Sequence, residues 1–325
     1  METGDLFELS TDRPSVLSVG VFDGVHLGHR KLLGRTVERA RSRGAAAVVV
    51  TFDPRPREVL RPDLPSEYLV TLPERVCLLA DIGFDYVAVI HFTRGIAAMV
   101  ADEFIRVLRE RYHLAELWVG PDFALGRGRG GTIPVLEELG AADGFEVGVL
   151  ERVMLDGELV SSSRIHAALA VGDVALAGRL LGRPHEVGGP VARGAARGRM
   201  INLPTANIAP PPRIALPANG VYAVRCTLLP EGAQVDRVGC FAREIPGSRE
   251  VLGVANVGVR PTFDSGERTL EAHLFDFDED IYGRTLRVAF VERLRPEVKF
   301  PSLQEFLAQI QRDIARARGI LGLKV

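Results

Sequence analysis

The stretch from residue 16 to residue 33, VLSVGVFDGVHLGHRKLL, constrains the fold of this chain more than any other. An apolar run from Val16 to Val21 predicts a buried β-strand. The turn Asp23-Gly24 follows, and a helical pattern begins at Leu27. A strand that passes through a glycine-bearing turn into a helix presents free backbone N–H groups and the positive end of the helix dipole. This local structure favours a bound phosphate group.

Two histidines, His26 and His29, stand between that strand and that helix, with Gly28 beside them. Residues three apart lie on one face of a helical turn, and the glycine lets a ligand approach the backbone closely. Two imidazoles placed there suit the charge that builds up on a phosphoryl group during displacement. A metal-binding pair is the alternative, but helical zinc pairs are usually four residues apart and no third histidine or cysteine lies nearby.

The string from Gly20 to His29 reads Gly-x-Phe-Asp-Gly-x-His-x-Gly-His and includes Phe22 and Asp23. It resembles the signature of the HxGH nucleotidyltransferase superfamily. The resemblance implies transfer of an adenylyl or cytidylyl group from a nucleoside triphosphate.

Length and charge limit the partners of the chain. Its 325 residues suffice for two domains, and its net charge of −2, without acidic or basic tails, argues against nucleic acid as an electrostatic partner. Cys77, Cys226 and Cys240 are too few and too scattered for a disulfide framework or a zinc site. Residues 1–13 lack the apolar core of a signal peptide, and no apolar run reaches transmembrane length. We therefore expect a cytoplasmic protein without a membrane partner.

Helical and strand patterns alternate through the first half of the chain. The predicted strands are 45–52, 86–92, 114–120 and 145–153, and the predicted helices are 31–43, 73–82, 100–113 and 136–140. Such alternation predicts a parallel sheet with helices on both faces. Trp118 lies within a predicted strand, where a place in the core is favoured over a role in ligand binding.

A glycine-rich loop, residues 120–131, follows one of these strands and contains the GxGxxG spacing of dinucleotide sites. The match is weak, because the fingerprint should follow its strand directly and six residues separate Val119 from Gly126. A mobile surface loop is the alternative. We favour a loop that faces a nucleotide, in which Arg127 and Arg129 reach phosphate groups.

A run of serines, residues 161–163, precedes an apolar stretch at 167–182 that predicts a pair of helices. Serines in this position cap a helix on structural grounds alone. Together with the adjacent Arg164, Ser162 and Ser163 also form a candidate second anion site.

The second half of the chain has a different pattern. Gly, Pro and Arg dominate residues 183–199, which we interpret as a boundary between domains 1–185 and 186–325. The predicted strands beyond it are 220–229, 251–259, 269–277 and 286–294, and strands without intervening helices predict an antiparallel barrel or sandwich. A closing amphipathic helix is predicted at 302–318, with an apolar stripe of Leu303, Phe306, Leu307, Ile310 and Ile314.

Two polar positions in this half are candidate site residues. Thr205 and Asn207 are two apart in an extended segment, so both oxygens point the same way, as hard ligands that Mg²⁺ accepts alongside triphosphate oxygens. On spacing alone, a polar turn before the prolines at 210–212 carries more weight. Glu271 lies on a predicted strand, where a carboxylate projecting into a barrel mouth suits a general base, although a single strand glutamate is usually solvated.

Several strings in the second half resemble a riboflavin kinase domain. In order, they are Pro-Thr-Ala-Asn at 204–207, Ala-Asn-Gly-Val-Tyr at 218–222, Asn-Val-Gly at 256–258, Arg-Pro-Thr-Phe at 260–263, Glu-Ala-His-Leu-Phe-Asp-Phe at 271–277 and Asp-Ile-Tyr-Gly at 280–283. Preceded by the HxGH module, residues 15–320 resemble the prokaryotic bifunctional riboflavin kinase / FAD synthetase family. The resemblance implies a Rossmann-like α/β nucleotidyltransferase domain, then an antiparallel β-barrel kinase domain with a C-terminal helix.

The same resemblance implies two reactions on small molecules. Riboflavin is phosphorylated by ATP to FMN, and FMN is then adenylylated to FAD with release of pyrophosphate. It implies Mg²⁺–ATP held by Thr205 and Asn207, and Glu271 as the base for the ribityl hydroxyl. In the N-terminal module it implies catalytic roles for the two histidines and ATP binding by Gly20, Phe22, Asp23, His26, His29, Asp122, Ser162, Ser163 and Arg164.

This chain departs from the family pattern at four places. Arg55 stands where the family usually has His, and His166 replaces the final Arg of the serine motif. Asn202-Leu203 stands in place of Gly-Phe before the Pro-Thr-Ala-Asn string, and Arg260 in place of Asn before Pro-Thr. The first two bear on adenylylation, and the last two bear on the fit of flavin or nucleotide in the kinase.

Two other functions remain open from the sequence. One is a regulatory protein that binds flavin and ATP and has lost an activity. The other is an HxGH nucleotidyltransferase for a different acceptor, with the β domain determining specificity.

Overall fold

The computed structural model describes residues 1–64, 66–193, 203–233, 245–259 and 268–323. The departures Asn202 and Arg260 therefore lie outside the described residues. The chain forms two compact units, one containing residues 1–66 and 74–160, the other containing residues 67–73 and the described residues from 161 to 323. Within the described residues, no helix combines the length and the apolar character needed to cross a membrane.

The first unit is built on a parallel sheet of six strands with the order β1-β4-β3-β2-β5-β8. Its strands are β1 (Glu2–Asp5), β2 (Ser15–Val19), β3 (Ala46–Phe52), β4 (Tyr86–Ile90), β5 (Leu114–Val119) and β8 (Glu146–Val149). The chain runs outward from β2 in one direction through β3 and β4, and in the other through β5 and β8. The strand order therefore reverses between β2 and β5, and ligands of open α/β sheets bind at the carboxyl ends of strands at such a point.

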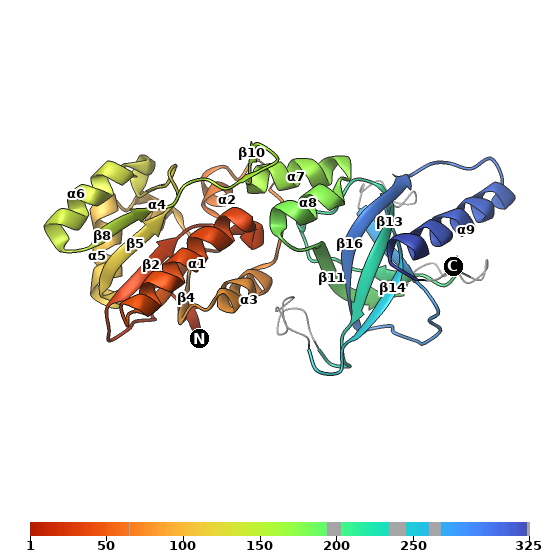
Figure 1. Ribbon diagram of the computed structural model, residues 1–325, viewed down its shortest axis with the longest axis horizontal. Helices are drawn as coiled ribbons and strands as arrows, with labels where there is room; N and C mark the ends of the chain where they lie inside the picture. Colours follow the sequence, from red (N-terminus) through yellow and green to blue (C-terminus); the bar gives the residue numbers. More distant parts are fainter. Residues whose placement is uncertain (65, 194–202, 234–244, 260–267, 324–325) are drawn as a thin grey trace. The chain divides into compact units, whose positions relative to one another are not determined.

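Helices cover both faces of this sheet, as predicted. They are α1 (Leu27–Ser42), α2 (Pro56–Leu60), α3 (Leu72–Ile82), α4 (Arg94–Ala98), α5 (Ala101–Tyr112) and α6 (Ile133–Asp143). Leu17, Val19, Val48 and Val50 alternate along β2 and β3 and pack with Phe104 of α5 in one apolar core. Figure 1 shows α1 across the sheet, where it contacts β2 and β3 on the face turned away from α5.

Short elements fill the connections of the first unit. They are the 3₁₀ turns η1 (Asp23–Val25) and η2 (Arg127–Arg129), and the two-residue strand pairs β6 (Ala124–Leu125) with β7 (Gly131–Thr132) and β9 (Met154–Leu155) with β10 (Glu158–Leu159). Trp118 lies in β5, as predicted, but it is only half-buried and does not belong to the buried core. It packs against Gly148 of the neighbouring strand and donates its indole N–H to Glu116 at 2.7 Å.

The second unit contains a closed antiparallel barrel of order β11-β12-β15-β14-β13-β16, which confirms the barrel over the sandwich. Its elements are α7 (Ser162–Val171), α8 (Val174–Leu181), β11 (His185–Ala192), β12 (Ala206–Ile208), β13 (Gly220–Leu228), β14 (Arg249–Val259), β15 (Arg268–Leu274), β16 (Thr285–Pro296) and α9 (Leu303–Ile320). The predicted helix pair α7–α8 is present and packs against the barrel, where the Ala218 N–H donates to the Leu169 carbonyl at 2.8 Å.

Strand β11 occupies part of the stretch 183–199 that the sequence marks only as a boundary. It escapes a pattern search because its centre reads Gly188-Gly189-Pro190, residues that are depleted in strands. A side chain at Gly189 would collide with the carbonyl of Ala209, so the glycine permits close approach of two backbones. Close packing within the barrel therefore explains a composition that looks like a linker.

Helix α9 lies beside β13 and β14 (Figure 1). Ala317 and Leu321 pack with Val221 and Ala223 of β13. Ile314 of the predicted stripe packs against this cluster, but Leu303 is 61% exposed, so its inclusion in the stripe is wrong. Leu303 occupies the first helical position, whereas the buried contact with the barrel is made by the later turns.

Candidate functional sites

The turn after β2 holds a strained backbone. Phe22, Gly24 and Val25 adopt positive φ angles of 49°, 75° and 41°. A β-branched residue such as valine is rarely found there, and such strain persists only where the surrounding structure enforces it. Before the turn, the Gly20 N–H donates to the Val50 carbonyl of β3 at 3.0 Å. The strain marks this turn, at the carboxyl end of β2, as a candidate functional site.

The two histidines begin the helix together. His26 is the N-cap of α1, and its Nδ1 accepts the backbone N–H of His29 at 3.3 Å. The two imidazoles stack with centroids 3.6 Å apart and planes 17° from parallel, and Phe22 meets His29 edge-on at 5.3 Å. The helix therefore starts at Leu27, where the helical pattern of the sequence begins, and a histidine side chain supplies its cap.

Burial sets the protonation of His29. Its side chain is partly exposed, but Nδ1 is buried and hydrogen-bonds to no residue in the described part of the chain. Burial lowers the pKa of His29 well below 6.5, and the neighbouring His26 lowers it further. A neutral imidazole carries one N–H donor, so His29 can donate to an anionic oxygen at neutral pH.

This lowered pKa predicts a loss of stability in acid. Below a pH of about 6.5, the unfolded chain takes up a proton at His29 that the folded chain does not bind. We expect the free energy of unfolding to fall as the pH drops through this range, by up to about 1.4 kcal/mol per pH unit from this residue. Urea denaturation of the wild type and of His29→Gln between pH 7.5 and 5.5 measures the difference. Equal slopes for the two proteins would contradict the assignment.

Asp122 lies in the loop after β5, the strand beside β2. Its exposed carboxylate accepts two hydrogen bonds from Arg152, at 2.6 and 2.7 Å. Arg129 donates to the Asp122 carbonyl at 2.8 Å, whereas the Arg127 side chain is exposed to solvent. The sheet order brings this loop and the histidine turn to the carboxyl ends of two adjacent strands.

The glycines of this loop have a packing role. A Cβ added at Gly126 would lie 2.7 Å from the Ala101 backbone nitrogen, and one at Gly131 would lie 2.7 Å from the Ala101 Cβ. The two glycines therefore let the β6–β7 pair press against the first residue of α5. The GxGxxG spacing reflects this contact and needs no dinucleotide to explain it.

The serine segment caps helix α7. The Ser161 hydroxyl accepts the Arg164 N–H at 3.2 Å, which confirms the capping role expected from the serines. Ser162, Ser163 and Arg164 form the first turn of α7, and His166 follows half-buried on the same helix. This segment belongs to the second unit, whereas the histidine pair belongs to the first.

Three polar residues form a row across the barrel wall. Asn207 of β12 is in register with Glu271 of β15, which is in register with Asn256 of β14. Directly opposed residues on antiparallel strands share a face, so the carboxylate lies between two amides. Their chain neighbours, such as Leu270 and Ala272, are buried inside the barrel.

Glu271 therefore lies on the outer face of the barrel, and its expected projection into the barrel mouth is wrong. The alternation of side chains along a strand explains the difference, because two apolar neighbours occupy the interior positions. Further along the same face, His273 Nδ1 lies 2.9 Å from the Pro204 carbonyl and donates to it. That bond anchors the segment that leads into Thr205.

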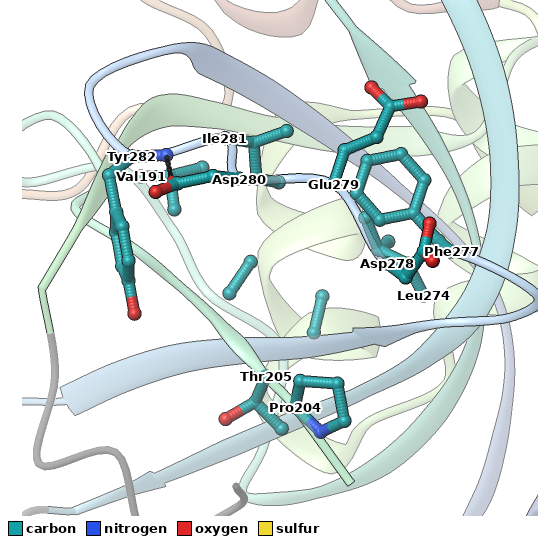
Figure 2. A pocket seen from close by; sticks show the side chains of 12 residues that line it. Val191, Pro204, Thr205, Leu274, Phe277, Asp278, Glu279, Asp280, Ile281 and Tyr282 are labelled. Atoms are coloured by element: carbon teal, nitrogen blue, oxygen red, sulfur yellow. Dashed lines mark hydrogen bonds between the residues drawn. The ribbon is translucent and has the colours of Figure 1, made fainter.

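A cavity of about 450 Å³ opens at the rim of the barrel beside Thr205. Figure 2 shows Pro204 and Thr205 on one side of it and Asp280, Ile281 and Tyr282 on the other. The Tyr282 N–H donates to Asp280 Oδ1 at 3.0 Å, which shapes the loop. The volume lies within the range of small-ligand pockets.

The cavity contains residues that the sequence analysis did not assign a role. Phe277, Asp280 and Tyr282 belong to the strings that carry the resemblance to a riboflavin kinase, so a signal for them was present without a chemical reason attached. Asn207 does not line the cavity; it lies on the outer face beside Glu271. Between Thr205 and Asn207, the buried Ala206 lines the cavity instead.

Comparison with known proteins agrees with this two-part organisation. The model of the family described as FAD synthetase matches residues 8–164, and that of the family described as riboflavin kinase matches residues 181–321. The bifunctional riboflavin kinase/FMN adenylyltransferase of Escherichia coli (strain K12) is 38% identical over 309 residues, covering 95% of this chain and 93% of that protein. The protein of the same description from Pseudomonas fluorescens is 38% identical over 310 residues, covering 95% and 93%.

A solved structure extends the likeness over the whole chain. A protein from Streptococcus pneumoniae, described as a macrolide-efflux protein, has a TM-score of 0.84 and 30% sequence identity, covering 96% of this chain and 97% of that one. Two family models in this order, together with relatives matched almost end to end, place the chain in the family of bifunctional riboflavin kinase/FMN adenylyltransferases.

Proposed function

We propose that the barrel unit transfers the γ-phosphoryl group of ATP to riboflavin, and that the parallel-sheet unit transfers AMP from ATP to the resulting FMN. The observation that carries the proposal is the pair of dissimilar sites. One unit holds a carboxylate between two amides on the outer face of its barrel, and the other holds a neutral imidazole at a helix start. A general base suits attack by a neutral hydroxyl, whereas FMN already carries a nucleophilic phosphate and needs no base.

In the kinase step, Glu271 accepts the proton of the ribityl hydroxyl of riboflavin while the oxygen of that hydroxyl bonds to the γ-phosphorus of ATP. The bond from that phosphorus to the bridging oxygen breaks, and ADP leaves. Asn207 and Asn256 flank the carboxylate and restrict its position.

Thr205 and Asn207 are the residues that would hold Mg²⁺ with the ATP. The fit rests on their chemistry, since a hydroxyl and an amide carbonyl are hard oxygen ligands and the Thr205 side chain borders the cavity. The described residues include no group of three or more His, Cys, Asp or Glu side chains arranged to hold a metal ion. Two neutral protein ligands suit an ion shared with triphosphate oxygens. When bound, Mg²⁺ supplies charge neutralisation on the β- and γ-phosphates.

In the adenylylation step, an oxygen of the FMN phosphate attacks the α-phosphorus of ATP. The bond to the β-phosphate oxygen breaks, and pyrophosphate leaves. The His29 N–H and the free N–H groups at the start of α1 stabilise the negative charge that develops, while His26 holds the cap. No covalent intermediate with the protein is required.

Other residues complete the adenylylation site in this proposal. Arg127 adds positive charge from the loop after β5. In the first unit, the residues proposed to bind ATP are Gly20, Phe22, Asp23, His26, His29, Asp122 and Arg127. Ser162, Ser163 and Arg164 belong to the second unit, and their part in ATP binding stays a prediction.

Product analysis tests the proposal. The purified protein is incubated with riboflavin, ATP and Mg²⁺, and flavins are separated by chromatography. We expect FMN to appear first and FAD to follow. Binding of flavin and ATP without any product would favour the regulatory protein. Failure to adenylylate supplied FMN, in a protein that still makes FMN, would favour a different acceptor.

We further propose that the kinase module functions without the first unit, and that helices α7 and α8 belong with it. Val174 and Leu180 of α8 are buried. His185, at the boundary expected from the sequence, donates through Nε2 to the Ala215 carbonyl at 2.8 Å. Fragment 161–325 should fold and make FMN. Fragment 186–325 should melt about 5–15 °C lower, because it loses these contacts. Calorimetry and FMN assays compare them, and equal melting temperatures would contradict a stabilising role for α7–α8.

A further inference from the structure

We propose that Arg55 is a positioning residue for adenylyl transfer, holding the strained turn that carries the histidine pair. The inference rests on the proposed function of the first unit. Arg55 follows β3, the neighbour of β2, and its side chain is nearly buried, with the residue 8% exposed. Nothing about its position marks it from the sequence except that the family usually has a different residue there.

The guanidinium group of Arg55 joins three separate segments. Its Nη1 lies 2.7 Å from Asp23 Oδ2 in the turn, its Nε lies 3.0 Å from Glu58 Oε1 in α2, and its Nη2 lies 2.5 Å from Ser66 Oγ. Each of the three nitrogens therefore has a protein acceptor. Such a contact needs the planar fork of arginine, which a lysine ammonium does not reproduce.

The contact falls at the centre of the strained turn. Asp23 lies between Phe22 and Gly24, both of which have positive φ angles, and is itself 4% exposed. A buried carboxylate needs a partner, because an unpaired charge in that position is strongly unfavourable. The ion pair therefore restrains the turn from its middle, three residues before His26.

A second arginine restrains the start of the same turn in another way. Arg75 of α3 donates to the Val21 carbonyl and to the Phe52 carbonyl, both at 2.9 Å, and Thr51 Oγ1 donates to the Val21 carbonyl at 3.1 Å. These bonds hold backbone at the carboxyl ends of β2 and β3. Arg75 holds Val21, whereas Arg55 holds the Asp23 side chain. Loss of Arg55 should therefore leave Val21 in place and release the segment from Asp23 to His26.

This arrangement makes Arg55 act through Asp23 and not on phosphate. Its charge is balanced by two carboxylates, and its donors are engaged within the protein. Two consequences follow. A substitution that removes the planar guanidinium group of Arg55 but keeps its positive charge should disturb the geometry of the site and so lower kcat. Loss of the charge should also leave Asp23 unbalanced near the triphosphate, which raises the KM for ATP.

The test measures steady-state conversion of FMN to FAD in the full-length protein at varied ATP. We expect Arg55→Lys to lower kcat about 10–100-fold with little change in KM for ATP, because small displacements of reacting groups have effects of this size. Arg55→Gln should lower kcat similarly and raise KM. Ser66→Ala, which removes one of the three acceptors, should have the same effect on kcat in a weaker form.

Arg39 provides a matched control in the same unit. It lies near the C-terminal end of α1 and forms a bidentate ion pair with the buried Glu116, in which Nε lies 3.0 Å from Oε2 and Nη2 lies 2.6 Å from Oε1. Arg39→Lys should leave the kcat of FAD formation within about twofold, even if it lowers the melting temperature. FMN formation from riboflavin and thermal melting, measured on the same preparations, report folding.

Each result decides the proposal. A kcat for FAD formation within twofold of the wild type in Arg55→Lys would overturn it, as would an equal loss in Arg39→Lys. If the Arg55 variants fail to fold, unchanged kcat in Ser66→Ala would overturn it. Failure of the proposed function looks different, because His29→Ala would then make FAD at the wild-type rate. Failure of this inference alone leaves FAD formation by His29→Ala strongly reduced.

Discussion

Replacement of Glu271 by glutamine is expected to lower the rate of FMN formation about 10²–10⁴-fold, the usual effect of removing a general base. Glutamine keeps the size of the side chain at its position between Asn207 and Asn256 but removes its basicity. Conversion of supplied FMN to FAD should persist, since that step takes place in the other unit. Initial rates with riboflavin and, separately, with FMN measure the two effects.

Glu250 offers a matched control for this experiment. It lies on β14, where the register places it opposite Thr227, and forms an exposed ion pair with Arg225 at 3.1 Å. Glu250→Gln removes a carboxylate from the same barrel without touching the row of three polar residues, and FMN formation should change less than about twofold. Loss of both activities in Glu271→Gln would show a damaged fold and contradict a role confined to the kinase.

The opposite pattern is expected when His29 is replaced by alanine. FMN should accumulate from riboflavin, and FAD formation should fall about 10²–10³-fold, the effect of removing one preorganised donor to developing charge. The reason is the position of His29, stacked on the capping His26 at the start of α1 with a neutral ring. Chromatographic time courses with riboflavin and with FMN follow both products.

His91 serves as the control for this variant, because it is an exposed histidine of the same unit, immediately after β4. His91→Ala should make FAD at the wild-type rate. Intact FAD synthesis in His29→Ala would remove the histidine pair from the reaction. Loss of FMN formation as well would contradict the assignment of the two steps to separate units.

The sequence by itself determined the architecture of each unit. The alternation of strands and helices predicted the parallel sheet, and four of the six barrel strands were readable from their apolar runs. These features follow from periodicity along one segment, which local side-chain order expresses directly. The order of the motifs likewise determined the family, because each string stands complete within a few residues.

Only the tertiary structure decided which residues lie opposite one another on neighbouring strands. The sequence contains Asn207, Asn256 and Glu271, but only the barrel register places them in one row on the outer face. The barrel strand with Gly189 at its centre was unreadable for a related reason. Gly189 is required because the backbone of Ala209 lies too close for a side chain. The residues next to Gly189 in the sequence give no sign of this contact.

The histidine pair could be predicted from the sequence, but the ion pair that restrains its turn could not. His26 and His29 lie in one helical turn, so their proximity follows from spacing alone. The ion pair between Asp23 and Arg55 joins residues 32 apart, and the residues meet because β2 and β3 are adjacent strands with their carboxyl ends at one edge of the sheet. Contacts of this kind depend on how strands are ordered and paired, and that order is a property of the folded chain as a whole.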